Sequence, residues 1–182
     1  MHVSVMVLTA AAGVAIGGCS SALLTRHPVA AATATLSDVN GASIGSVQLW
    51  QEASGLVHVD ASATNLSPGA HGIHFHAVGR CDGGTTAFST AGAHYNPLSR
   101  EHGLSNPAGP HAGDAPNLEI GAAGSGHLSF TTDRVTLTAG STTLFDGDGS
   151  AVVVHGAPDD QVSQPSGNSG ARIACGVIRS TP

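Results

Sequence analysis

Short alternating segments separated by turn residues constrain the fold of this chain more than any other feature. Apolar and polar residues alternate over 43–52 and over 55–63, so that Val57, Val59 and Ala61 share one face of a predicted strand. Asn40-Gly41 precedes these segments, and this dipeptide strongly favours a hairpin turn. Further predicted strands cover 33–36, 72–77, 118–120, 126–131, 135–137, 150–155 and 173–178. Short strands at this spacing predict an all-β barrel or sandwich.

Two long segments do not follow this pattern. The stretch 79–117 shows no sustained period of 2 or 3.6, and it contains four of the nine prolines. A loop of this length is uncommon in a compact domain unless a disulfide or a metal orders it. A shorter loop rich in glycine, serine and proline covers 156–170. The sequence has no internal repeat, and we expect one domain over 33–182.

Charge and composition exclude several classes of protein. The chain has 12 acidic residues against six arginines and no lysine, a net charge of −6 without a basic cluster. Nucleic-acid binding is therefore not expected, because it requires basic side chains that neutralise the phosphates. Only 10% of residues are charged and 41% are hydrophobic, unlike a helical bundle or a disordered chain. Eleven histidines are the outlier, and function should be sought among them.

The N-terminal segment predicts export. The apolar run 3–16 is too short to cross a membrane comfortably and suits the core of a signal peptide. Gly17-Gly18 before Cys19 resembles the lipobox of bacterial lipoproteins. We predict a signal peptide over 1–18, lipidation of Cys19 and a tether over 19–32. The protein would then be exported to the cell envelope and contact the membrane only through this lipid. An uncleaved anchor is the alternative, because no Lys or Arg precedes Arg26.

With Cys19 lipidated, two thiols remain, Cys81 and Cys175. An even pair in an exported protein predicts a disulfide, whereas two buried free thiols are disfavoured in an oxidising compartment. The two cysteines are 94 residues apart, so the closed loop would stabilise the fold by ~4 kcal/mol.

Seven residues with metal-binding side chains gather in the long loop and in two predicted strands. His74 and His76 are two positions apart on a strand, so both imidazoles project from one face. Three imidazoles and one carboxylate make a set suited to zinc. The remaining imidazoles make an all-nitrogen set of the type that copper accepts. Solvated loop histidines are the alternative interpretation. The other five residues are His94, His102, His111, Asp114 and His155.

Five motifs, in order along 33–178, resemble those of the copper/zinc superoxide dismutases. They are 69–76 (GAHGIHFH), 91–103 (AGAHYNPLSREHG), 111–114 (HAGD), 147–155 (GDGSAVVVH) and 167–178 (GNSGARIACGVI).

The resemblance implies a fold and an activity. The fold would be an eight-stranded antiparallel Greek-key β-barrel, an immunoglobulin-like sandwich with a long metal- and disulfide-bearing loop and a shorter second loop. The activity would be disproportionation of superoxide to O2 and hydrogen peroxide, with one copper and one zinc in each subunit. His94 would bridge the two metals, which requires the loss of its second proton. The implied copper ligands are His74, His76, His94 and His155, and the implied zinc ligands are His94, His102, His111 and Asp114.

The resemblance also assigns roles to residues that do not bind metal. Arg172 matches a guanidinium that attracts and orients superoxide beside the copper, and with His94 it is the implied catalytic pair. Asp159 matches a carboxylate that links a copper ligand to a zinc ligand. Cys81 and Cys175 match the family's intrasubunit disulfide.

Three departures from the family pattern bear on function. Ala115-Pro116-Asn117 replaces the usual Leu-Gly-Asn, so the zinc loop is expected to leave the site on a different path. The second loop has no lysine, which predicts weaker steering of superoxide. Arg179 places a charge where family members form an apolar dimer face, so both a monomer and a homodimer are open. The alternative function is a non-catalytic copper- and zinc-binding module, a buffer or chaperone, on the same fold.

Overall fold

The computed structural model describes residues 1–2 and 28–182. Residues 3–18 of the predicted signal peptide, Cys19 and most of the predicted tether lie outside the described residues. Among the described residues, no helix is long and apolar enough to span a membrane.

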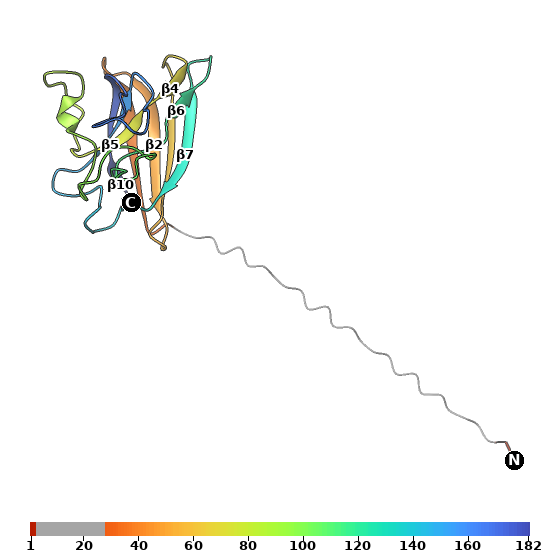
Figure 1. Ribbon diagram of the computed structural model, residues 1–182. Coiled ribbons are helices and arrows are strands. Elements are labelled where there is room, and N and C mark those ends of the chain that lie inside the picture. Colours follow the sequence, from red (N-terminus) through yellow and green to blue (C-terminus); the bar gives the residue numbers. More distant parts are fainter. Residues whose placement is uncertain (3–27) are drawn as a thin grey trace.

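The regular secondary structure of the described chain consists almost entirely of β-strands (Figure 1). The only helical element in 28–182 is the short 3-10 helix η1, Ser89–Ala91. All pairings between these strands are antiparallel. The strands are β1 Ala30–Asp38, β2 Ser43–Gln51, β3 Val57–Ala63, β4 Gly69–His71, β5 Ile73–His76, β6 Leu118–Ile120, β7 Gly126–Thr132, β8 Ala151–His155, β9 Arg172–Val177 and β10 Arg179–Thr181.

The strand order shows that the sheet curls into a nearly closed barrel. The order is β4-β6-β7-β3-β2-β1-β9-β8-β5, with β10 paired to β1. β4 and β5 lie at opposite ends of this order, yet only Gly72 separates them along the chain. Counted as one bent strand, they complete eight strands, with β10 as a short addition. β7 lies beside β3 and β9 beside β1, which are the non-sequential neighbours of a Greek key. The predicted all-β barrel is confirmed.

The alternation seen in the sequence places one face of β2 and β3 in the core. Val47 and Leu49 of β2, and Val57 and Val59 of β3, are all buried. β8 is buried on both faces, because residues of the long loop cover its outer side. The loop and the strands form a small apolar cluster here, separate from the main core. It consists of Phe88, Ala91, Ala151, Val153 and Cys175. The long loop is therefore packed onto the barrel, beside which it runs in green in Figure 1.

The predicted strand 135–137 is wrong. Thr136 makes one isolated bridge to Thr143, and the segment is otherwise irregular. Val135 and Leu137 are buried, so the alternation reflects a loop packed against the core. The Leu137 amide donates to Gln51 Oε1 at 2.6 Å, a side-chain partner in place of a strand.

Other strand boundaries also differ from the prediction. The predicted strand 72–77 is shorter in the structure, where β5 covers Ile73–His76. A separate strand, β4, lies before Gly72 in residues that look like a turn because of Ser67-Pro68-Gly69. β10 is not predicted by the pattern. β1 begins at Ala30, so the last three residues of the predicted tether, 30–32, belong to the barrel.

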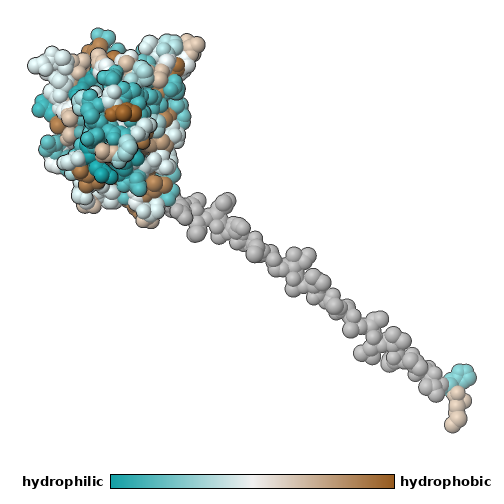
Figure 2. Space-filling model, in the orientation of Figure 1, coloured by the Kyte–Doolittle hydropathy of each residue, from teal (hydrophilic) through white to brown (hydrophobic). Residues whose placement is uncertain are grey.

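The outer surface is mostly polar. Figure 2 shows a face on which hydrophilic side chains predominate and hydrophobic ones are scattered. Large exposed hydrophobic residues in 28–182 occur singly, mainly in loops, which is ordinary for a globular protein.

Candidate metal centre

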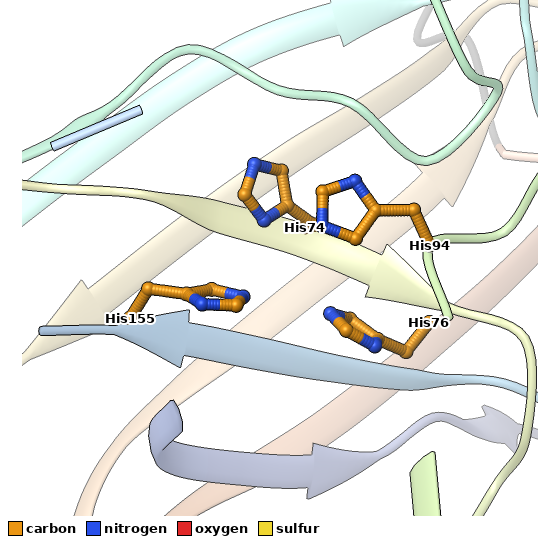
Figure 3. Close-up of side chains that lie close together, drawn as sticks. All are labelled: His74, His76, His94 and His155. Atoms are coloured by element: carbon orange, nitrogen blue, oxygen red, sulfur yellow. The ribbon is translucent and has the colours of Figure 1, made fainter. Parts of the chain in front are cut away.

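β5 and β8 are adjacent strands that bring three histidines to one place. His74 and His76 alternate with the core residue Phe75 on β5, and His155 ends the neighbouring β8. The long loop adds His94, which forms an isolated bridge to His76 on the other side of β5. Figure 3 shows the four imidazoles pointing toward a common space.

One ring nitrogen from each of these four histidines lies within 4.8 Å of the others. Four ring nitrogens in this space have no hydrogen-bond partner although they are buried. An unsatisfied buried polar atom is costly, so four that converge fit a metal ion that accepts their lone pairs. The unpartnered atoms are His74 Nδ1, His76 Nε2, His94 Nε2 and His155 Nε2.

The second nitrogen of three of these rings is held by a fixed acceptor. His76 Nδ1 donates to the Gly92 carbonyl at 3.0 Å, and His155 Nδ1 donates to the carbonyl of Gly170 at 3.3 Å. His74 Nε2 donates to Asp159 Oδ2 at 2.7 Å. These bonds set the tautomer of each ring and leave the other nitrogen free for a metal.

A second cluster surrounds the carboxylate of Asp114. Its Oδ1 lies 3.0 Å from His94 Nδ1, 2.9 Å from His102 Nδ1 and 3.3 Å from His111 Nδ1. Its Oδ2 accepts from the amides of Gly103 at 2.8 Å and His111 at 2.9 Å. Ligand atoms of the four side chains lie within 4.8 Å of one another. Three nitrogens and one oxygen are a donor set that suits zinc.

Two residues join the clusters. His94 belongs to both, through Nε2 on one side and Nδ1 on the other. Asp159 accepts from His74 Nε2 through Oδ2 and from His102 Nε2 at 3.0 Å through Oδ1. The carboxylate of Asp159 is therefore in contact with one histidine of each cluster, as the resemblance implies.

Burial controls the protonation of the first cluster. It lowers the pKa of His94 to about 4, against an opposing hydrogen bond to Asp114, and the pKa of His155 to about 3. Burial also lowers the pKa of His74, and it lowers that of His76 well below its usual value. These imidazoles are neutral near pH 7, which is the form that binds metal.

The second cluster behaves differently because His102 contacts two carboxylates, that of Asp114 within the cluster and that of Asp159 beside it. Burial alone would lower the pKa of His102, but hydrogen bonds to Asp114 and Asp159 raise it to about 9. Burial alone would raise the pKa of Asp114, but its histidine partners hold this pKa well below the usual range.

Arg172 lies close enough to the first cluster for its charge to act on His76 and His155. Its Nη1 donates to the Phe88 carbonyl at 2.8 Å, and its Nη2 donates to that of Gly92 at 2.6 Å. Its positive charge contributes to the lowered pKa values of His76 and His155. A cavity of about 260 Å³ is lined by Arg172 together with the small residues Thr86, Ala87, Gly170 and Ala171.

The predicted disulfide is present. Cys81 and Cys175 are bonded, with their Cα atoms 5.6 Å apart, and this ties the long loop to β9. Cys175 is three residues from Arg172 on the same strand, and the loop holds both carbonyl partners of the guanidinium. The disulfide thus connects the two elements that position Arg172.

A family model described as copper/zinc superoxide dismutase (SODC) matches residues 43–178. The chain belongs to the copper/zinc superoxide dismutase family. It is accordingly an oxidoreductase whose family uses copper and zinc.

Relatives match over most of the chain. Superoxide dismutase [Cu-Zn] 1 of Aquifex aeolicus is 40% identical over 163 residues, which cover 87% of this chain and 95% of the relative. Superoxide dismutase [Cu-Zn] of Caulobacter vibrioides is 39% identical over 81% of this chain and 85% of its own.

Among solved structures, a SOD-like protein from Bacillus subtilis is 36% identical, with a TM-score of 0.74, and covers 80% of this chain and 96% of its own. A double mutant of that protein, with a tyrosine and a proline replaced by histidines, also has a TM-score of 0.74.

Sequence reasoning missed three amide side chains around this superoxide dismutase site. Asn117 Nδ2 donates to the Asp159 carbonyl at 2.9 Å, and Asn117 Oδ1 accepts from the Asp159 amide at 2.9 Å. Gln161 and Gln164 make comparable contacts with His102, Leu104 and Ala115 of the long loop. Asn117 is the last residue of Ala115-Pro116-Asn117, the segment that departs from the family pattern. Periodicity could not have identified any of these three side chains, because all lie in loops.

Proposed function

We propose that this chain is an exported superoxide dismutase, with a copper site bridged through His94 to a zinc site. One observation carries the proposal: four buried, unpartnered imidazole nitrogens converge, and one of those rings also lies against Asp114. A solvated loop histidine would not be buried in this way.

The free atoms suggest which residues would hold each metal. Copper would be bound by His74 through Nδ1 and by His76, His94 and His155 through Nε2. Zinc would be bound by the Nδ1 atoms of the second cluster and by the Asp114 carboxylate. The proposed zinc ligands are His94, His102, His111 and Asp114.

The reaction converts two superoxide ions and two protons into O2 and hydrogen peroxide. Copper would supply the one-electron exchange that oxidises one superoxide and reduces the next. His94 can contact two metals only after it loses its second proton, and its Nε2 can then take up and release a proton needed for peroxide. Asp114 orients the other nitrogen of this ring.

Arg172 is proposed to attract and orient superoxide. Two carbonyl groups hold its guanidinium in place, so that the positive charge stays fixed beside the cavity. A fixed cation favours an anionic substrate without the entropy cost of ordering a free side chain.

We propose that the chain acts in the cell envelope, with cleavage after residue 18, lipidation of Cys19 and a functional domain over 33–182. The disulfide supports export, because such bonds persist in oxidising compartments. A protein there would remove superoxide at the cell surface, as a monomer or a homodimer.

The test is superoxide dismutation by the chain from residue 19 onward, carrying Cys19→Ser and reconstituted with copper and zinc. We expect one copper and one zinc per chain and rapid turnover. His155→Ala should bind copper at least about tenfold more weakly and lose most of the activity. The matched control is His127→Ala, because the His127 side chain is exposed and contacts only Asp60 in the described structure.

The second candidate is a non-catalytic metal-binding module. It is supported by the name of a Bacillus subtilis relative, "Superoxide dismutase-like protein", which is 41% identical over 140 residues. Stoichiometric copper and zinc without turnover would establish this function and exclude the enzyme.

A further inference from the structure

Two glutamine side chains of the second loop, 156–170, form hydrogen bonds with the part of the long loop that would bind zinc, residues 102–115. Gln164 Oε1 accepts from the His102 amide at 2.9 Å, and Gln164 Nε2 donates to the His102 carbonyl at 3.0 Å. The amide group of Gln164 therefore satisfies both main-chain groups of His102. Nε2 also donates to the Val162 carbonyl at 3.2 Å, which holds the side chain in its own loop.

Gln161 connects the two halves of the zinc-binding loop. Its Oε1 accepts from the Leu104 amide at 3.2 Å, and its Nε2 donates to the Ala115 carbonyl at 3.2 Å. Its main-chain carbonyl accepts from the Ser105 amide at 3.1 Å. One residue thus contacts the segment after His102 and the residue that follows Asp114.

The fit around these contacts is close. A Cβ atom on Gly103 would overlap the Gln161 carbonyl, so the two loops meet main chain to main chain at this point. His102 itself is fully buried, and both of its ring nitrogens contact carboxylates. The second loop therefore fixes His102 twice, through the ring by Asp159 and through the main chain by Gln164.

We propose that Gln164 and Gln161 are positioning residues that hold His102 and the ends of its loop in the geometry that retains zinc. The proposal rests on zinc occupying the second cluster, as proposed above. Two hydrogen bonds to one ligand residue restrict its backbone, and loss of such supporting contacts commonly weakens metal binding. In this chain, the lysine-free second loop then serves to retain zinc.

The experiment measures zinc release from the copper- and zinc-loaded chain to a colorimetric chelator, 4-(2-pyridylazo)resorcinol. Gln164→Ala removes both bonds to His102, and Gln161→Ala removes those to Leu104 and Ala115. Gln164→Glu keeps the side-chain volume and the acceptor for the His102 amide, but it loses the donor to the His102 carbonyl. This variant provides the test if Gln164→Ala does not fold. Gln48→Ala is the matched control, because Gln48 is exposed on β2.

We expect release about tenfold faster from Gln164→Ala, a smaller increase from Gln164→Glu, and the wild-type rate from Gln48→Ala. With Co2+ in the zinc site, Gln164→Ala should also shift the visible absorption bands, because the His102 ligand is displaced. Wild-type release rates or unchanged Co2+ bands in the folded Gln164 variants would overturn the inference. A wild-type chain that binds no zinc would instead contradict the proposed function, so the two failures can be told apart.

Discussion

The chemistry of single residues depends here on which ring nitrogen of each histidine is left free. His76 and His155 give their Nδ1 atoms to main-chain carbonyls, whereas His74 gives its Nε2 to Asp159. The free atom is therefore Nδ1 in one ring and Nε2 in the other two. Because the free atom differs between the rings, His74 and His76 on β5 and His155 at the end of the neighbouring β8 can all place a ring nitrogen near one point.

Removal of both metals is expected to leave a chain whose stability is greatest near pH 6.5. Burial lowers the pKa of His94 to about 4 and that of His155 to about 3, from 6.5 when unfolded. The unfolded chain then binds more protons, so stability falls as the pH decreases from 6.5 towards 4. The pKa of His102 is raised to about 9 despite its burial, so its contribution is complete below 6.5 and is lost as the pH rises through 9.

Urea unfolding of the chelator-treated chain at several pH values measures this profile. His102→Asn should lose the decrease on the alkaline side and keep the decrease on the acidic side. A stability independent of pH between about 4 and 9 would contradict the assigned protonation states.

At the scale of elements, close contact between loops determines the site as much as the strands do. Gly167 lies in the second loop at φ +65°, and a Cβ atom there would overlap Asp159 Oδ1 and lie 2.8 Å from His102 Nε2. Only glycine leaves room for the contact between these two side chains. The main chain at Gly167 thus bounds one side of the space that holds the Asp159 carboxylate, which contacts both clusters.

Gly167→Ala is expected to weaken zinc binding about 10- to 100-fold, because the added methyl group displaces Asp159 from His102. Competition for zinc against a chelator of known affinity measures the effect. Gly147→Ala is the control, since no atom lies within 4 Å of the position of its added Cβ. Equal zinc affinity in the two variants would show that Asp159 tolerates the displacement.

At the scale of the whole molecule, one disulfide cross-links the long loop to the barrel. Cys81 and Cys175 are separated by 94 residues, and the bond closes a loop that contains five of the proposed metal ligands and the two carbonyl partners of Arg172. It restricts the unfolded chain and also ties the loop that holds the carbonyl partners of Arg172 to β9.

The Cys81→Ser, Cys175→Ser double variant is expected to lose ~4 kcal/mol of the free energy of unfolding. Urea unfolding of the metal-loaded chain measures it, with the reduced wild type as a second sample. A loss below about 1 kcal/mol in both samples would mean that the packing of the loop makes the disulfide redundant.

The charge of the whole molecule predicts a dismutation rate that depends little on salt. The net charge is −6, and the loop 156–170 contains two aspartates and no basic residue, so Arg172 acts against the overall field. We expect the second-order rate constant to change less than about threefold between about 0.01 and 0.15 M ionic strength.

Arg172→Gln should lower this rate constant at every ionic strength, while Arg100→Gln, at an exposed loop position, should not. A steep decrease of the wild-type rate with added salt would indicate long-range steering by other groups.

Local patterns along the chain were sufficient to predict the strand-rich fold and the candidate site. Alternation with a period of two is a local property, so β2, β3 and β7 could be predicted from neighbouring residues alone. The same local rule failed at 135–137, where a buried loop alternates without a strand partner. The grouped histidines and the motifs that resemble a known family indicated the two clusters, and counting cysteines indicated the disulfide.

The separation of β4 from β5 at Gly72, which closes the barrel, and the pairing of β10 with β1 became visible only in the folded chain. The tertiary structure also shows which nitrogen of each histidine in the first cluster is free, and that Gln164 and Gln161 bond to His102 and Leu104. These properties depend on residues far apart in the chain: His102 and Gln164 are 62 positions apart. A hydrogen bond of this kind leaves no trace in local periodicity, because its partners meet only when the two loops pack together.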